Sequence, residues 1–333
     1  MSDRIKIKEI GKEKIKDNIS PEDERIINMY LIEKQKKSDH SYNLNKSILY
    51  NFFNSVNKRI EKITMKDVRD YFIELDKKEL TYNTKCTYRS FISSFFYYFQ
   101  GLKLNEGKIH PNPVPNKRIW DFNKTNKDIK KHNREKERLS IQEINKILEY
   151  CKKNLNTKNK KKYFIYYCFL TFSGARPSEI VSIKVKDINL TERYFETGFE
   201  KNARKSTRHL QRALLFFIPK GFIKYLKNYL LINDSEWLIP SNDRYFHSTT
   251  EGLNYIRRKI LEKKIGIRWK DRWFRRSLIT EYTKKGLPDG YREGLLNHVS
   301  HSTEWRYYIK LSIKEKRKIF DQYFPYYGKI PYF

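Results

Sequence analysis

The chain has 333 residues, and because single hydrophobic cores usually stop growing near about 250–300 residues, two domains are expected. Its 71 Lys and Arg against 39 Asp and Glu give a formal net charge of +32, spread along the whole length, which indicates a polyanionic partner, most commonly nucleic acid. An aromatic content of 15% and clear apolar periodicity argue against a disordered basic coat, although charge alone does not exclude a ribosomal or chromatin-like protein.

The cysteines and histidines predict no metal site. The three cysteines lie far apart without a CxxC spacing, and the seven histidines form no metal-ligand pattern with them, which favours a reducing compartment and no structural zinc. Residues 1–25 do not resemble a signal peptide, and no apolar run approaches about 18 residues. We therefore expect a soluble, cytoplasmic protein with no membrane partner.

Residues 20–115, after a charged leader at 1–19, are predicted to form a small helical bundle. The run SPED at 20–23 combines an N-cap serine, a proline at the first helical position and an acidic third position. Three further amphipathic helices are predicted from apolar spacing, at 44–56, 68–75 and 88–99.

The bundle is predicted to end at HPNPVP, residues 110–115, because three prolines stop any helix. The highly charged stretch that follows, 116–138, is predicted to be a basic linker that touches a polyanion.

Residues 139–311 are predicted to form a mostly helical domain with a small antiparallel sheet. A capping box at Ser140 and Glu143 starts it, and a nearly continuous apolar run at 163–172 predicts a buried helix. Strand signals lie at Ile183 and Val185, then at 194–199 and 213–219, and the last two would form a hairpin whose turn, 200–212, is rich in Lys and Arg.

The helical pattern returns after this hairpin and continues towards the C-terminus. Helices are predicted at 222–231, 253–260, 274–285 and 291–296. In the C-terminal tail, 312–333, a capping box at Ser312 and Glu315 predicts one more helix.

Residues suited to acting on a phosphodiester lie in three segments of this second half. Arg176 follows a glycine in SGARPSEI (173–180), Arg272 and Arg275 share a helix face in RWFRRSLIT (272–280), and His298 and Tyr307 lie in LLNHVSHSTEWRYY (295–308). Guanidinium groups neutralise phosphate oxygens bidentately, and stabilising the charge of the transition state is usually the largest catalytic effect. A tyrosine can be the covalent nucleophile and a lysine can protonate the leaving oxygen, so this set can cut a phosphodiester without a metal.

These segments resemble the three conserved boxes of the tyrosine recombinase, or phage integrase, family. SGARPSEI is similar to the family's T-G-x-R-x-x-E-L, RWFRRSLIT to H-x-L-R-H-S-F-A-T, and LLNH to L-L-G-H. The bundle with its aromatic helix and Asn-Pro connector is similar to the family's core-binding domain, so the resemblance extends over about residues 20–310. It implies a mainly α fold with a small antiparallel sheet, built from a helical (SAM-like) core-binding bundle and a C-terminal tyrosine-recombinase catalytic domain.

The resemblance also implies a role for each site residue. Arg176 and Arg275 would hold the scissile phosphate, and His298 would bind the phosphate or support the transition state. The family's nine-residue step from that histidine leads to Tyr307 as the nucleophile, with the adjacent Tyr308 as the alternative.

The catalytic lysine of the family lies in the hairpin turn, where Lys201 is the first candidate and Lys205 the second. Two positions depart from the family pattern. Arg272 replaces the usual histidine, and although a guanidinium is a poor base, it can bind phosphate or lower the pKa of the tyrosine by its charge. Asn297 replaces the glycine before His298, and asparagine accepts left-handed conformations.

The resemblance implies site-specific recombination of double-stranded DNA through a 3′-phosphotyrosyl intermediate, without metal, cofactor or small-molecule substrate. Its purpose would be integration or excision of a mobile element, or resolution of chromosome dimers. A homotetramer on two DNA sites is expected, with the tail 312–333 available to contact a neighbouring subunit. A type IB topoisomerase-like enzyme and a DNA-binding protein of the same fold that no longer cuts remain alternatives.

Overall fold

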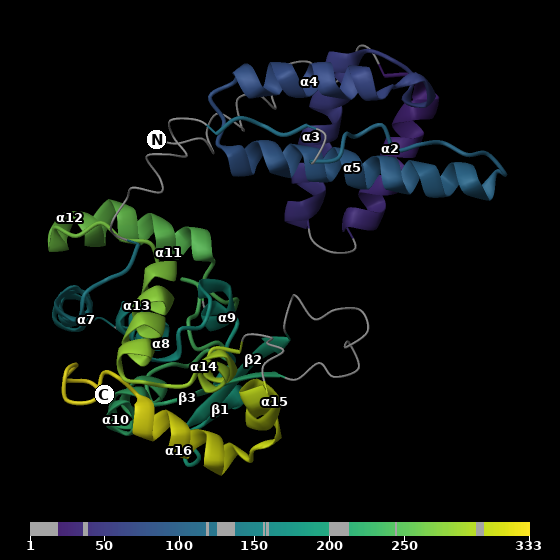
Figure 1. Ribbon diagram of the computed structural model, residues 1–333. Coiled ribbons are helices and arrows are strands. Elements are labelled where there is room, and N and C mark those ends of the chain that lie inside the picture. The colour runs from purple at the N-terminus through teal and green to yellow at the C-terminus, as the bar shows by residue number, and fades with distance from the viewer. Residues whose placement is uncertain are drawn as a thin grey trace. The chain divides into compact units, whose positions relative to one another are not determined.

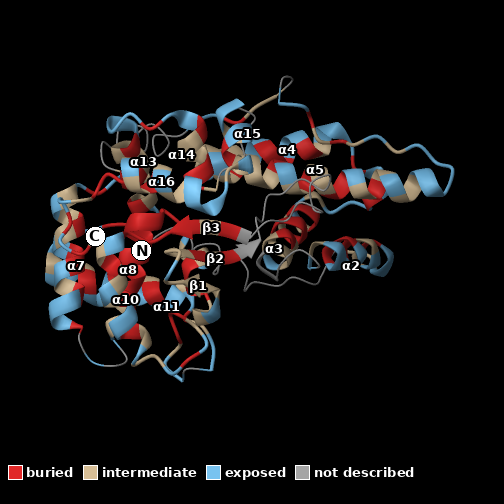
Figure 2. Ribbon diagram, turned by 90° about the horizontal axis from the view of Figure 1, so that it is seen from below, coloured by how far each residue is buried: buried red, intermediate tan, exposed pale blue. Residues whose placement is uncertain are grey.

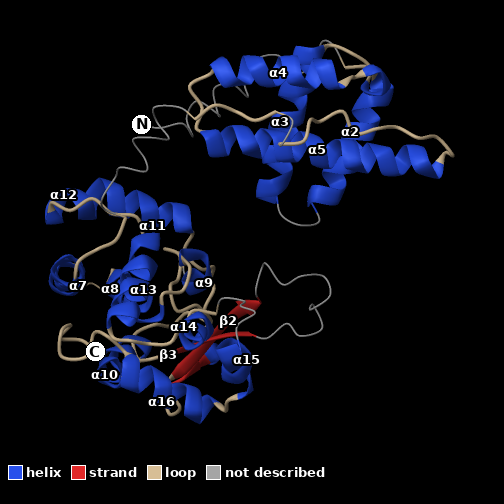
Figure 3. Cartoon of the chain, viewed as in Figure 1, coloured by secondary structure: helices blue, strands red, loops and turns tan. Residues whose placement is uncertain are grey.

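The computed structural model describes residues 19–35, 39–117, 120–124, 137–155, 157, 160–199, 213–243, 245–297 and 303–333. The chain divides into two compact units, Met1–Glu135 and Lys136–Phe333 (Figure 1). Each unit has its own hydrophobic core. Helices dominate both, and the described residues form one three-stranded antiparallel sheet, in the second unit (Figure 3). The predicted fold class is therefore confirmed.

The first unit contains the four predicted helices. Ser20 Oγ accepts a hydrogen bond from the backbone N–H of Asp23 (3.2 Å) at the start of the first one. A capping box between Thr64 and Asp67 starts the third. Their bounds are α2 (Pro21–Gln35), α3 (Asp39–Val56), α4 (Met65–Lys77) and α5 (Tyr82–Asn105).

Two buried cations of α5 attach the segment after the prolines to this unit. Lys85 pairs with Asp76 of α4 and donates to the carbonyl oxygen of Asn123 (3.4 Å). The guanidinium of Arg89 donates to Asp121 Oδ1 (3.1 Å) and to the carbonyl oxygen of Trp120 (3.0 Å). Trp120 itself packs against the aromatic core of the unit. Residues 120–123, at the start of the expected linker, thus pack on the first unit.

The second unit is assembled around α8 (Lys161–Ser173), which is buried along most of its length (Figure 2). Its sequence is apolar on all sides, and it contacts elements in every direction, including the sheet. The surrounding elements are α7 (Ile141–Asn154), α9 (Pro177–Val181), β1 (Ile188–Asn189), β2 (Tyr194–Phe199), β3 (Ala213–Phe217), α10 (Ile223–Leu230), α11 (Thr250–Ile256), α12 (Glu262–Ile265), α13 (Arg272–Lys284), α14 (Asp289–Leu295), α15 (Thr303–Lys310) and α16 (Ile313–Tyr323).

The sheet has the order β1-β2-β3 and contains the predicted hairpin. Phe195 of β2 lies opposite Phe216 of β3, and their rings stack at 5.2 Å between centroids. The predicted strand at Ile183 and Val185 is wrong, because Val185–Asp187 forms a 3-10 helix. The backbone there pairs outside the sheet: Leu238 N–H donates to Ile183 O (2.9 Å) and Val185 N–H to Glu236 O (2.8 Å), which explains the extended, apolar sequence pattern.

The C-terminal residues pack on the second unit itself. The predicted capping box of Ser312 and Glu315 is present at the start of α16. Phe320, Phe324 and Ile330 then join the core that surrounds α8. Among the described residues, no helix combines the length and the apolar character that crossing a membrane requires.

Candidate active site

The turn between α8 and α9 requires a glycine. Gly174 ends α8 with a φ of +60°, a left-handed conformation that costs other residues about 1–2 kcal/mol. A Cβ atom at this position would lie 2.9 Å from Leu296 Cδ2 and 3.1 Å from Leu278 Cδ2. Gly174 therefore lets the chain turn sharply while it packs closely on α13 and the end of α14.

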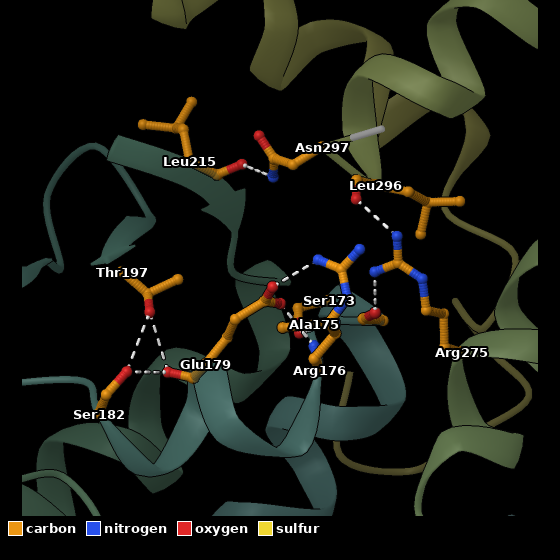
Figure 4. Close-up of polar contacts among 11 residues, drawn as sticks. Ser173, Ala175, Arg176, Glu179, Ser182, Thr197, Leu215, Arg275, Leu296 and Asn297 are labelled. Atoms are coloured by element: carbon orange, nitrogen blue, oxygen red, sulfur yellow. Dashed lines mark hydrogen bonds and ion pairs between the residues drawn. The ribbon is translucent and has the colours of Figure 1, made fainter. Parts of the chain in front are cut away.

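Arg176 follows this turn at the N-cap of α9, with Pro177 in the first helical turn. The carboxylate of Glu179 accepts hydrogen bonds from both the backbone N–H and Nη1 of Arg176, each at 2.6 Å. The carbonyl oxygen of Glu179 accepts in turn from the hydroxyls of Thr197 and Ser182, each at 2.9 Å (Figure 4). Glu179 thus orients Arg176, whose side chain remains 44% exposed.

Arg275 of α13 lies next to Arg176 and joins three segments of the unit. Its Nη1 donates to the carbonyl oxygen of Gly174 (2.5 Å) and its Nη2 to that of Leu296 (2.8 Å) (Figure 4). Burial, and secondly the positive charge of Arg176, lower the pKa of Arg275 to about 10, while Glu179 acts in the opposite direction. Two adjacent guanidinium groups, with only the carboxylate of Glu179 paired to one of them, form a position that favours a bound anion (Figure 4).

Asn297 follows α14 and takes the conformation that its position requires. Its φ is +52°, which confirms that asparagine can stand where the family has glycine. Its Nδ2 donates to the carbonyl oxygen of Leu215 in β3 (2.8 Å) and so attaches the end of α14 to the sheet (Figure 4).

The two tyrosines of α15 lie in opposite environments. Tyr308 is 5% exposed and covers Gly294 of α14, where a Cβ atom would lie 2.2 Å from the tyrosine ring. Burial raises the pKa of Tyr308, so its hydroxyl resists ionisation. Tyr307 is 58% exposed. Of the two hydroxyls, that of Tyr307 is the one that a large substrate can reach.

Arg272 pairs with Glu137, whereas Arg275 contacts Gly174 and Leu296. Its Nη2 is 3.6 Å from Glu137 Oε1, and Arg276 pairs with the other oxygen of the same carboxylate. The side chains of Arg272 and Arg276 are 51% and 43% exposed. Arg275 therefore contacts Gly174, whereas Arg272 and Arg276 contact Glu137.

Three predicted site residues, Lys201, Lys205 and His298, lie outside the described residues. The hairpin that carries the two lysines is described up to the pair Phe199 and Ala213, at the ends of β2 and β3. Within the described ranges, no group of three or more His, Cys, Asp or Glu residues has the arrangement of a metal site.

Sequence reasoning missed Thr197 and Glu137. Thr197 lies on the same face of β2 as Phe195, and both are buried, so a polar residue in the alternating apolar pattern was the available signal. Glu137 is one acidic residue in a basic stretch, and the sequence contains no signal for its partners.

Comparison with known proteins identifies the class to which this fold and site belong. Residues 137–315, more than half of the chain, match the phage integrase family. A tyrosine recombinase of Thermosipho africanus (strain TCF52B) is 23% identical over 297 residues, which cover 86% of this chain and 94% of that protein.

Solved structures show the same fold. The Tn1549 transposon integrase in complex with transposon right end DNA superposes with a TM-score of 0.59 at 12% identity, covering 88% of this chain and 97% of that one. The XerH site-specific recombinase bound to difH substrate gives a TM-score of 0.53 at 18% identity, covering 83% and 76%. The chain belongs to the phage integrase family, the tyrosine-type site-specific DNA recombinases.

Proposed function

We propose that the protein cuts and rejoins duplex DNA through a covalent 3′-phosphotyrosyl intermediate on Tyr307. The tyrosine oxygen attacks the scissile phosphorus, the bond to the 5′ oxygen breaks, and that oxygen leaves with a proton. Attack by the 5′ hydroxyl of a partner strand then reverses the step. The phosphodiester energy is kept in the tyrosyl bond, so the cycle consumes no nucleotide.

The observation that carries this proposal is the pair of adjacent guanidinium groups on Arg176 and Arg275. Burial and mutual repulsion disfavour the charged form of Arg275, whose pKa falls to about 10. A phosphodiester between the two arginines would relieve that repulsion, and the extra negative charge of the pentavalent state would be bound more strongly still. The carbonyl oxygens of Gly174 and Leu296 hold Arg275 before the substrate arrives, so little reorganisation is needed.

We assign the remaining roles by their place in the sequence. His298 binds the phosphate or supports the transition state, and Lys201, or alternatively Lys205, protonates the leaving 5′ oxygen. Arg272 supplies positive charge and not a base, since a guanidinium stays protonated at neutral pH.

A DNA substrate with a nick near the scissile phosphate tests the nucleophile, because loss of the short cleaved strand traps the covalent adduct. We expect wild type and Tyr308→Phe to form an adduct and Tyr307→Phe to form none. Tyr308→Phe keeps the ring over Gly294 and serves as the matched control. An adduct that persists in Tyr307→Phe and disappears in Tyr308→Phe would transfer the assignment to Tyr308.

The DNA complexes of the Tn1549 integrase and XerH support duplex DNA as the substrate. We propose that a homotetramer acts on two DNA sites in the cytoplasm, for integration or excision of a mobile element or for dimer resolution. Relaxation of supercoiled DNA without strand exchange would favour a type IB topoisomerase-like activity. Binding without any adduct would favour a DNA-binding protein that no longer cuts.

A further inference from the structure

Helix α13 carries three arginines that point to two different places. Arg275 donates to the carbonyl oxygens of Gly174 and Leu296 beside Arg176. Helix spacing alone would put all three arginines on one face, but Arg272 and Arg276 both pair with the carboxylate of Glu137. A second cationic position thus exists on α13.

Solvent and ligands can reach this second position. The side chains of Arg272, Arg276 and Glu137 are 51%, 43% and 38% exposed. Ion pairs at such exposure contribute little to stability, so a stronger anion can replace the carboxylate at little cost. One carboxylate also neutralises only one of the two guanidinium charges.

The backbone near Glu137 is attached independently of its carboxylate. Two residues further on, the N–H of Leu139 donates to Ser277 Oγ (2.8 Å), and that hydroxyl lies 2.8 Å from the carbonyl oxygen of Leu139. Ser277 is buried on α13. The Glu137 side chain can therefore leave the two arginines by rotation, while the chain that carries it stays on α13.

We propose that Arg272 and Arg276 form a second phosphate subsite, which Glu137 occupies in the free protein and a backbone phosphate of DNA occupies in the complex. This inference rests on the proposed function, since it takes duplex DNA as the substrate. In the free protein both arginines pair with Glu137, whereas Arg275 contacts Gly174 and Leu296, and we take the phosphate that they bind to be another than the one that is cut. The two guanidinium groups come from successive helical turns. A phosphate, with more oxygens than a carboxylate, can accept hydrogen bonds from both of them.

The test compares the binding of a short duplex of arbitrary sequence to wild type and to Glu137→Gln, by fluorescence anisotropy over a salt series. Glu137→Gln keeps the shape of the side chain and removes the competing charge. Each additional phosphate contact steepens the salt dependence by about 0.9 in the log–log slope, so affinity should rise about threefold at low salt and fall more steeply with salt. In Arg272→Gln/Arg276→Gln the slope should become shallower, and adding Glu137→Gln to that variant should change nothing.

Glu149→Gln is the matched control. Glu149 forms an exposed ion pair with Lys153 on α7. Its replacement by Gln changes the net charge of the protein by the same amount as Glu137→Gln. An equal gain from both substitutions would show a general charge effect and overturn the subsite. So would a gain from Glu137→Gln that survives the loss of both arginines.

Covalent adduct formation on the nicked DNA, measured in the same variants, separates this inference from the proposed function. If wild type forms no adduct, the cleavage proposal fails while the salt dependence still decides the subsite. If adducts form and the salt dependence of all variants matches wild type, only the subsite fails. Thermal unfolding of each variant confirms that the compared proteins are folded.

Discussion

Each unit of the protein holds an arginine largely out of solvent, and the two are compensated in different ways. Arg89 in the first unit donates to the carboxylate of Asp121 and lies over three aromatic rings, with its Cζ atom 4.7 Å from the centroid of Phe122. Arg275 in the second unit donates to two neutral carbonyl oxygens and has a second guanidinium, that of Arg176, as a neighbour. The charge of Arg89 is thus neutralised by a carboxylate, whereas the charge of Arg275 is not.

This difference indicates what each arginine does. A buried cation with its own carboxylate and cation–π contacts closes a local set of interactions and contributes to folding. A cation that is held by neutral carbonyl oxygens beside another cation lacks a negative charge to balance it, and an external anion can supply that charge. We therefore interpret Arg89 as the residue that attaches the segment 120–123 to its unit, and Arg275 as a phosphate ligand.

The largest expected effect that tests this comparison is on cleavage by Arg275→Met. Adduct formation should fall by at least about 10²–10³-fold, the usual cost of losing one donor to a developing charge. Stability should stay within about 1 kcal/mol of wild type. The pKa of Arg275 is lower in the folded chain than in the unfolded chain, so its charge costs stability at every pH below about 10, and removing it offsets the loss of two hydrogen bonds.

Single-turnover cleavage of nicked DNA and urea unfolding measure the two quantities on the same protein. A large loss of stability in Arg275→Met would mean that this arginine supports the fold as Arg89 does, and the proposed difference between the two arginines would be wrong.

Arg89→Met should show the opposite pattern. It removes one partner of the Asp121 carboxylate, which keeps the hydroxyl of Tyr82, and it leaves the carbonyl oxygen of Trp120 without the guanidinium. It also removes the contact with the aromatic rings. Because Asp121 is partly exposed, we expect a loss of about 2–3 kcal/mol in the unfolding free energy of the first unit, less than for a fully buried pair. Limited proteolysis should cut near residues 120–123 sooner than in wild type, whereas an unchanged digestion pattern would argue against this attachment.

How far the sequence predicted the molecule depends on how local each signal is. Helix starts were predicted well, because a capping box such as Ser140 with Glu143 lies within four residues and specifies its own geometry. The hairpin was also predicted, since alternation and the basic turn between its strands are local. The strand predicted at Ile183 and Val185 was wrong, because the backbone there pairs outside the sheet, with a segment some fifty positions away at Glu236 and Leu238.

The site follows the same rule. The geometry of Gly174 and Asn297 was predictable, since positive φ leaves few residue choices. The contacts of Arg275 with Gly174 and Leu296 join positions far apart in the sequence, and Glu137 meets Arg272 across a similar separation. Only the tertiary packing brings these groups together, so no local pattern could have indicated that the arginines of α13 divide between two positions.

The smallest effect that we predict concerns anion binding in the absence of DNA. Sulfate is tetrahedral like a phosphodiester and carries one more negative charge, so between Arg176 and Arg275 it would relieve the repulsion that lowers the pKa of Arg275. At a sulfate concentration about ten times its dissociation constant, mass action stabilises the folded protein by about 1.4 kcal/mol. Thermal unfolding in sodium sulfate and in sodium chloride of equal ionic strength measures this gain.

Comparing Arg275→Met with Arg89→Met shows whether the stabilisation by sulfate comes from the Arg176 and Arg275 pair. Sulfate also strengthens apolar burial in every protein, so the relevant quantity is the difference between variants and not the shift itself. The part of the shift that is specific to sulfate should be smaller in Arg275→Met than in Arg89→Met, since Arg272 and Arg276 remain in both variants and only Arg89→Met keeps the Arg176 and Arg275 pair. Equal shifts in both variants would mean that the Arg176 and Arg275 pair binds no anion in the free protein, and that the excess charge of Arg275 is balanced in some other way.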